Sequence, residues 1–435
     1  MAEVVAEAES RSVGAVRAAP SLLSLSALLL GVAVLVLGNG LQGTLLGVRA
    51  GTEGMAADTI GLIMSAYFVG YAVGSFLAPP LVERVGHIRT FAALASIASA
   101  IALAHAMFVG PAAWTLLRVA HGACYAGLIM VVESWINAST DQRYRGRVLA
   151  TYSVVLYAAW ALSQPLLNLA PPTGFVLFCI VSICLSLALV PIALMRAGGP
   201  GVIAASRRGL GRLYEISPVG VAGALVVGLV TGALWGMGPT FAQRIGLSDA
   251  GISAFMGLTM LGALALQWPL GWLSDYVGRR PVMLGACLAA GTASLALVWG
   301  VERPSSPLLY ALSFLFGGFS ITMYSLAIAH VNDHIEADEL IAAASGLVLV
   351  YGVGAALGPF SASLAMGCLG PSGLFLFTAT ILFGFVAFDI YRMLRRGPVP
   401  RAVRETFVGV PSTTHASLPL HKHGTGRAPG KRAPG

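Results

Sequence analysis

The sequence predicts an all-α polytopic membrane protein with 12 transmembrane helices arranged as two pseudo-symmetric six-helix bundles. Of its 435 residues, 57% are hydrophobic and 10% are charged, whereas a soluble domain carries roughly 25% charged residues. The apolar stretches are continuous, and helices satisfy their own backbone hydrogen bonds inside lipid. Landmarks of the first half also recur in the second half.

At about 20 apolar residues for each crossing, the chain contains twelve candidate spans. We expect the first to be retained rather than cleaved as a signal peptide, because its apolar core is long and no small-residue cleavage pattern follows it before the second. The spans cover residues 22–47, 59–80, 90–110, 113–136, 148–169, 174–195, 217–238, 249–272, 282–301, 308–330, 341–366 and 371–394.

Basic residues are distributed unevenly about these spans. With both termini on the inner side, 22 of the 26 arginine and lysine residues fall inside, while Arg49, Arg244 and Arg303 fall outside. Because basic loops stay in the cytoplasm, we expect both termini there and an even number of spans. The arginine-rich, lysine-poor usage suggests a bacterial plasma (inner) membrane. The net charge of +8 is then a consequence of topology and needs no nucleic-acid partner.

The two halves repeat and are joined by a stretch rich in Gly, Arg and Ser. Tyr157 and Pro165 are eight residues apart, as are Tyr351 and Pro359, at an offset of 194. Such internal duplication is typical of carriers with a site at the midplane of the bilayer. We therefore expect a cytoplasmic N-tail (1–21), an N-terminal six-helix bundle (22–196), a cytoplasmic linker (197–216), a C-terminal six-helix bundle (217–396) and a disordered basic C-tail (397–435).

No enzyme motif is found in the chain. Four of the five cysteines lie inside spans and Cys368 lies just after one, without metal-binding spacing, and there is neither a nucleophile elbow nor a phosphate-binding loop. We expect no enzyme activity, no cofactor and no metal site.

The segment Gly271-Trp-Leu-Ser-Asp275-Tyr-Val-Gly278-Arg279-Arg280, between the eighth and ninth spans, resembles the loop signature of the major facilitator superfamily. A degraded first copy lies between the second and third spans, where Glu83 and Gly86 are kept but the leading Gly and the basic pair are lost. Arg118-Val-Ala-His-Gly122 is similar to the R-x-x-x-G pattern of the family. The runs Glu133-Ser-Trp-Ile-Asn137, Tyr144-Arg-Gly-Arg147 and Gln267-Trp-Pro-Leu-Gly271 are similar to a branch of bacterial permeases with largely unassigned substrates.

The fourth span contains a polar stripe of Arg118, His121, Tyr125 and Glu133, which fall on one helix face. Arg118 has two interpretations: it binds an anionic group of the substrate or tunes a proton site, or it bonds carbonyls and polar groups to hold helices together. Glu133 lies too far along the helix to pair with Arg118. It either meets an inner-loop arginine such as Arg145 or Arg89 as a latch, or carries a proton. His121 either relays protons or is a packed, hydrogen-bonded residue.

In the major facilitator superfamily, spans one, four, five, seven, eight and ten line the central cavity. The resemblance therefore implies substrate-facing candidates, although polar contacts between helices would explain the same residues. These candidates are Asn39, Gln42, Arg118, Tyr125, Tyr157, Trp160, Gln164, Trp235, Gln267 and Tyr324.

Gating is assigned to the loop signature and its first copy. Asp275 can accept a hydrogen bond from Arg279 at the inner end of its span. A second candidate latch pairs the basic loop around Arg143, Arg145 and Arg147 with the acidic loop containing Asp333, Glu336, Asp338 and Glu339; the alternative is two solvated loops. The gating candidates are Glu83, Gly86, Gly271, Asp275, Gly278, Arg279 and Arg280.

Together these observations predict a secondary active transporter of a small solute that works by alternating access, with the proton as the default coupling ion. The expected partners are a small-molecule substrate, the lipid bilayer and protons, and the protein is expected to be a monomer. The alternative is a non-transporting membrane sensor or receptor on the same fold.

Overall fold

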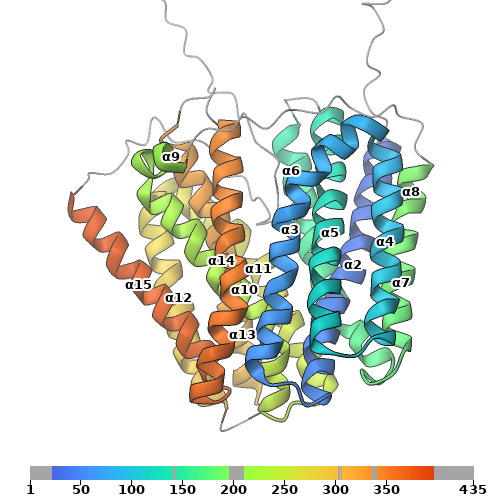
Figure 1. Ribbon diagram of the computed structural model, residues 1–435. Coiled ribbons are helices and arrows are strands. Elements are labelled where there is room, and N and C mark those ends of the chain that lie inside the picture. The colour runs from blue at the N-terminus through green and yellow to red at the C-terminus, as the bar shows by residue number, and fades with distance from the viewer. Residues whose placement is uncertain are drawn as a thin grey trace, which may run out of the picture.

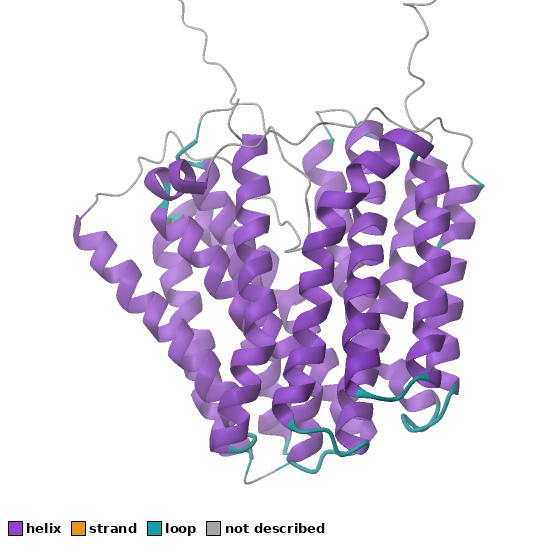
Figure 2. Ribbon diagram, in the orientation of Figure 1, coloured by secondary structure: helices purple, strands orange, loops and turns teal. Residues whose placement is uncertain are grey.

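The computed structural model is helical in nearly all of the residues that it describes, which are 22–140, 144–194, 210–301, 304, 306–335 and 340–395 (Figure 2). The predicted N-tail, most of the predicted linker and the predicted C-tail lie outside these residues. The predicted fold class, an all-α polytopic membrane protein of the two-bundle type, is confirmed.

Long helices run side by side along the molecule (Figure 1). The N-terminal half consists of α2 (Leu22–Thr52), α3 (Ala57–Val85), α4 (His87–Met107), α5 (Pro111–Ser139), α6 (Arg145–Ser163), the 3₁₀ helix η1 (Gln164–Leu169), α7 (Val176–Leu187) and α8 (Leu189–Ala193). The short α9 (Leu210–Ile216) lies in the predicted linker. The C-terminal half consists of α10 (Pro218–Arg244), α11 (Asp249–Val277), α12 (Arg279–Gly300), α13 (Pro307–Asn332), α14 (Leu340–Leu369) and α15 (Gly373–Arg395).

We call the two ends of the molecule the Gly54 end and the Gly86 end, after the turns that join α2 to α3 and α3 to α4. In Figure 1 the Gly54 end is at the bottom and the Gly86 end, with α9, is at the top. Helices extend beyond several predicted spans, since α2 continues to Thr52 and α10 to Arg244. Polar residues outside the hydrocarbon layer do not interrupt a helix that its apolar core has already formed.

Eleven helical segments in the described part of the chain are long and apolar enough to cross a membrane. The predicted fifth span is divided differently, because α6 ends at Ser163 and η1 continues the path. Pro165 has no backbone N–H to donate, which favours the change to a tighter helix. Beyond η1, the carbonyls of Pro172 and Thr173 accept hydrogen bonds from Arg49 at the Gly54 end. Since α6 starts at the opposite end, α6 and η1 together complete the twelfth crossing.

Glycines let neighbouring helices approach closely at equivalent places in the two halves. A Cβ on Gly70 of α3 would collide with the backbone of Val119 in α5. In the C-terminal half, a Cβ on Gly262 of α11 would collide with the backbone of Phe314 in α13. Small residues at helix contacts are a common means of packing inside membranes.

The turns at the Gly86 end also repeat. Gly86 and Gly278 have φ values of 86° and 116°, in the region that glycine tolerates best. Each glycine ends one helix and begins the next: Gly86 donates its backbone N–H to Val82, and Gly278 donates to Ser274. These turns bring α4 and α12 back alongside the preceding helices.

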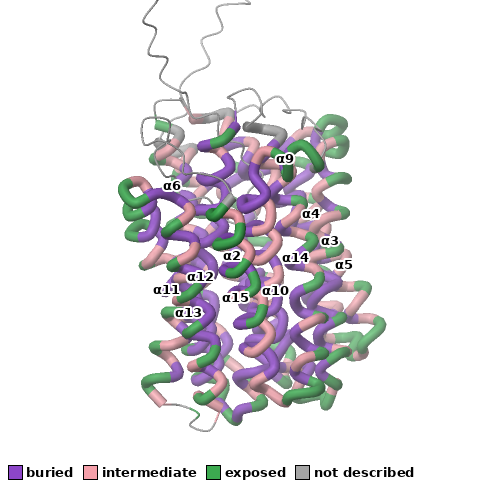
Figure 3. Tube along the Cα trace, turned by 90° about the vertical axis from the view of Figure 1, so that its left-hand side faces the viewer, coloured by how far each residue is buried: buried purple, intermediate pink, exposed green. Residues whose placement is uncertain are grey.

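Buried residues follow the interior of the helix bundle, and exposed ones cover its outside (Figure 3). Many exposed side chains are large and apolar, including Trp268 and Trp299, which are 74% and 78% exposed. Such a surface is stable only against lipid.

Candidate functional site

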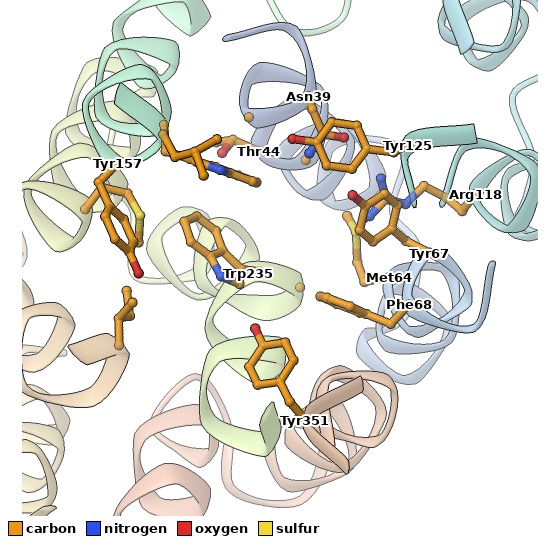
Figure 4. A pocket seen from close by; sticks show the side chains of 17 residues that line it. Asn39, Thr44, Met64, Tyr67, Phe68, Arg118, Tyr125, Tyr157, Trp235 and Tyr351 are labelled. Carbon is orange, nitrogen blue, oxygen red and sulfur yellow. The ribbon is translucent and has the colours of Figure 1, made fainter. Parts of the chain in front are cut away.

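A cavity lies between the two halves and receives side chains from both (Figure 4). The space that its walls surround measures about 950 Å³, part of it open to solvent. Most of the lining is aromatic or aliphatic. The lining residues are Asn39, Gly40, Gly43, Thr44, Met64, Tyr67, Phe68, Arg118, Tyr125, Leu156, Tyr157, Trp160, Trp235, Gly236, Met260, Ile321 and Tyr351.

Arg118 of α5 is the cation in this lining, and its side chain is 5% exposed. Its guanidinium carbon lies 4.3 Å from the centre of the Tyr67 ring, and Nη2 is 3.8 Å from the Met64 sulfur. Within the described residues, its Nε has no hydrogen-bond acceptor and no carboxylate forms an ion pair with it. A buried guanidinium presents five N–H donors, and here a ring face and a thioether meet it instead of oxygen atoms.

A small polar cluster borders Arg118. His121 is fully buried, and its Nε2 lies 3.0 Å from Asn39 Oδ1. Because the amide oxygen accepts, the hydrogen on the ring belongs at Nε2 in this arrangement. The imidazole also stacks on Tyr125, with ring centres 6.5 Å apart. His121 therefore lies behind the cavity wall and orients Asn39 and Tyr125, which line the cavity.

The wall opposite Arg118 comes from α6, α10 and α14. Trp160 and Trp235 have ring centres 4.4 Å apart and connect the two halves across the cavity. The hydroxyl of Tyr351 is 3.0 Å from Thr231 Oγ1, which holds the ring in place. This side of the cavity offers large aromatic faces, and the polar groups of these rings are the tyrosine hydroxyls and the indole N–H groups.

Six of the ten cavity candidates from the sequence line the cavity, and the other four lie behind it. Gln164 accepts from the Thr44 hydroxyl at 2.7 Å, and Gln267 donates to Ser325 at 3.4 Å. The Tyr324 ring packs on Tyr351, with centres 5.0 Å apart. Gln42 is fully buried, outside the cavity lining, and its amide makes no hydrogen bond to the described residues.

Sequence reasoning missed Thr44, Met64, Tyr67, Phe68 and Tyr351 as lining residues. Tyr67 and Phe68 lie in an ordinary apolar span, and nothing in the composition of that span indicates that they line a cavity. The signal was the nearby Gly70, which allows α3 to press against α5 and brings Tyr67 onto Arg118.

Glu133 is buried at 3% exposure and accepts a hydrogen bond from the Tyr152 hydroxyl at 3.3 Å. Arg89, one expected partner, is exposed. The side chain of Arg145, the other, lies outside the described residues. Glu133 stands apart from the cavity lining and nearer the Gly86 end.

The loop signature forms a connected set of charges at the Gly86 end. Arg279 donates to Asp275 Oδ1 at 2.5 Å and to Ser274 Oγ at 2.5 Å. Its Nε also lies 3.4 Å from Asp333 Oδ2, near the end of α13. Arg280 pairs with Asp389 of α15 at 3.0 Å. The loop therefore joins α11, α12, α13 and α15.

The first copy of this loop is built differently. Glu83 is exposed, and His87 occupies the position after Gly86 that Arg279 occupies after Gly278. The His87 ring lies 3.1 Å from Ser134 Oγ of α5 and packs on Trp135. A ring that joins two helices here replaces the charge network of the other half.

The predicted latch between two loops can be followed only in part. Asp333 is engaged by Arg279 of its own half, and Arg147 is exposed. Arg143, the side chain of Arg145, and Glu336, Asp338 and Glu339 lie outside the described residues.

The hydrogen bonds between the two halves lie on the Gly54 side, as far as the described residues show. The Gln243 amide of α10 donates to the Val48 carbonyl at 3.1 Å and to Thr52 Oγ1 at 3.0 Å. Between α14 and α3, the Phe360 N–H donates to Ser65 Oγ at 3.2 Å. A Cβ on Gly51 would overlap the Gln243 amide, so only glycine permits this approach without a shift. These contacts join the two halves on the Gly54 side of the cavity, and we call them the seal at the Gly54 end.

Comparison with known proteins agrees with this architecture. A model of the Major Facilitator Superfamily matches residues 28–213 and 220–424. An uncharacterised MFS-type transporter of Enterobacter sp. (strain 638) is 27% identical over 377 residues, which cover 86% of this chain and 97% of the relative. YcaD of Escherichia coli, also described as an uncharacterised MFS-type transporter, is 28% identical over 367 residues, which cover 84% of this chain and 93% of YcaD.

Two solved structures share the fold. The crystal structure of the nucleoside transporter NupG superposes with a TM-score of 0.72 at 14% identity and covers 86% of this chain and 100% of its own. A bacterial homologue of the human lysosomal transporter Spinster, inward-facing and occupied, gives a TM-score of 0.70 at 15% identity and covers 89% of this chain and 99% of its own. At such identities the likeness concerns the fold alone.

Proposed function

The chain belongs to the major facilitator superfamily, a family of membrane transporters, and we propose that it moves a small solute across the bacterial plasma membrane by alternating access. The family assignment points to a transporter rather than an enzyme and to a multi-pass membrane protein. The solute, in this proposal, binds in the cavity between the halves.

One observation carries the proposal: the cavity is lined by both halves, and the described hydrogen bonds between the halves lie to one side of it. A site that both halves share changes its access when one half tilts against the other. The seal uses a few side-chain hydrogen bonds, and each is worth about 0.5–1.5 kcal/mol. Breaking such a seal is compatible with a transport cycle.

The asymmetry of basic residues supplies the orientation in this proposal. The excess of arginine at the Gly86 end supports a cytoplasmic position for that end. With that orientation the seal at the Gly54 end faces outward, and we assign this structure to the inward-facing state of the proposed cycle. Both termini are cytoplasmic in the same scheme.

The proton is our proposed coupling ion, with Glu133 as its carrier. A carboxylate in a span is costly when charged and accepts a proton readily. The Tyr152 hydroxyl gives Glu133 one hydrogen bond in this conformation, and the tilt of the halves would change its surroundings.

The test measures access to the cavity directly. Thr44 lines the cavity, so a Thr44→Cys variant, made after replacing the native cysteines, reports access by reaction with an impermeant maleimide. Alternating access predicts reaction from either face of oriented vesicles. A second pair of cysteines at Thr52 and Gln243, joined as a disulfide so that Thr44→Cys keeps its free thiol, should abolish labelling from outside and leave labelling from inside.

A matched cross-link serves as the control. Cysteines at Arg49 and Thr173 also lie at the Gly54 end, but both belong to the N-terminal half, where Arg49 donates to the Thr173 carbonyl. Joining them should leave labelling from both faces unchanged. Labelling from one face only in the absence of any cross-link would contradict the proposal.

A further inference from the structure

The charged side chain in the cavity lining is positive, and no negative side chain of the lining balances it. Arg118 is buried in the lining, and no Asp or Glu is among the lining residues. The lining otherwise offers the Asn39 amide, the Thr44 hydroxyl, tyrosine and tryptophan groups, and apolar surface. A bound solute therefore meets a positive charge without a compensating negative one.

Arg118 is also incompletely bonded. Its Nε has no acceptor within the described part of the chain, and Nη2 meets the Met64 sulfur, which is a weak acceptor. The Tyr67 ring covers one side of the guanidinium at 4.3 Å, which positions the group by cation–π attraction and leaves its N–H edge without oxygen partners. A carboxylate matches this edge because it offers two oxygens in the plane of the guanidinium fork.

The rest of the cavity favours an apolar body on the solute. Phe68 and Tyr351 extend into the space from α3 and α14, and Trp235 lies between them and Tyr157 in Figure 4. Aromatic faces of this kind bind rings and short aliphatic chains through dispersion and burial.

From these observations we propose that the solute is a small organic monoanion with an aromatic or aliphatic body, whose carboxylate binds Arg118 while its body packs on the aromatic wall. The assignment rests on the proposed transport function. It also implies discrimination, because an ammonium group at the same place would be repelled by Arg118.

A structural role for Arg118 would account for the same contacts with Tyr67 and Met64, so the test must separate binding from folding. Thermal stabilisation of the detergent-purified protein gives apparent affinities without requiring transport. The probes are benzoate, phenylacetate and indole-3-acetate, each beside its neutral amide, with phenethylamine as the cationic probe.

We expect at least one of the carboxylates to stabilise the wild type, and its amide to bind about tenfold more weakly or worse, the loss expected for one charged hydrogen bond. Phenethylamine should leave the melting temperature of the protein unchanged. Arg118→Gln should remove the preference for the carboxylate, whereas Arg118→Lys should keep it at lower affinity. Should Arg118→Gln fail to fold, Tyr67→Leu should weaken binding of the carboxylate and preserve its advantage over the amide.

Equal binding of carboxylate and amide by the wild type would overturn the assignment. Unchanged carboxylate affinity in folded Arg118→Gln would also overturn it, as would the absence of any shift in melting temperature with all three carboxylates. None of these results would touch the alternating-access proposal, because the labelling of Thr44→Cys needs no substrate. Conversely, one-sided labelling would refute alternating access while leaving the binding preference measurable.

Discussion

Gln243 of α10 donates its side-chain amide to the backbone carbonyl of Val48 in α2 at 3.1 Å, and so one side chain connects the two halves of the molecule. The same amide reaches Thr52 Oγ1 at 3.0 Å. Both acceptors lie in the last turns of α2. A substitution at Gln243 therefore removes two of the hydrogen bonds that join the halves at the Gly54 end.

Replacing Gln243 with alanine should therefore shift the protein toward the state open at the Gly54 end. Two hydrogen bonds worth about 1 kcal/mol each would be lost, which corresponds to a change of about tenfold or more in the equilibrium. The outside labelling rate of Thr44→Cys should rise accordingly. Gln267→Ala is the control, since Gln267 bonds Ser325 within its own half; an equal rise in that variant would refute a specific effect.

Asp275→Asn should slow transport while leaving solute affinity close to that of the wild type. The substitution weakens the charged hydrogen bond from Arg279 but leaves the cavity lining intact. Glu83→Gln, in the first copy of the loop, should have a smaller effect because Glu83 is exposed. The test measures the transport rate and the solute affinity, from thermal shifts, on the same preparations. A wild-type transport rate in Asp275→Asn would exclude a gating role.

Asp389→Ala should destabilise the protein by about 3–5 kcal/mol, the range for removing one partner of a buried ion pair. Asp389 is fully buried and accepts from Arg280 at 3.0 Å. Glu53→Ala breaks the ion pair between Glu53 and Arg49, whose side chains are 34% and 15% exposed, respectively. This substitution should lower the free energy of unfolding by about 1 kcal/mol or less. Melting temperatures in one detergent measure both variants, and similar losses for the two would contradict this account.

Gly70→Ala should impair folding of the N-terminal half, because the added methyl group would strike the Val119 backbone, which cannot move aside as a side chain could. Gly352→Ala is a suitable comparison, since a Cβ there has no neighbour within 4 Å. We expect Gly70→Ala to lower both the yield and the melting temperature and Gly352→Ala to preserve them. Normal stability of Gly70→Ala would show that α3 and α5 separate at little cost.

Much of the architecture could be predicted because lipid imposes simple rules on the sequence. Continuous apolar runs identify the spans, and the repeated glycine turns at Gly86 and Gly278 identify the duplication. The change from α6 to η1 at Gln164 was missed, since one proline within an apolar run does not reveal which helix type follows it.

Residues of the cavity lining could be predicted only where a polar or large aromatic side chain interrupts an apolar span. Asn39, Arg118 and Trp235 are conspicuous in apolar spans and do line the cavity. Gln42 and Gln267 are just as conspicuous, yet they lie behind the wall, because a helix face is assigned only once its neighbours are known. Tyr67 and Phe68 carry no distinguishing signal of their own; the nearby Gly70 allows α3 to pack closely on α5, which places them beside Arg118.

The most direct measurement is solute counterflow in proteoliposomes containing the Thr52→Cys/Gln243→Cys protein, joined by a bismaleimide that a reductant cleaves. The solute is the carboxylate that stabilises the protein most. Our account predicts that flux stops when the Gly54 end is cross-linked and returns after cleavage, while the Arg49→Cys/Thr173→Cys protein transports throughout. Undiminished flux through fully cross-linked protein would contradict alternating access around this cavity.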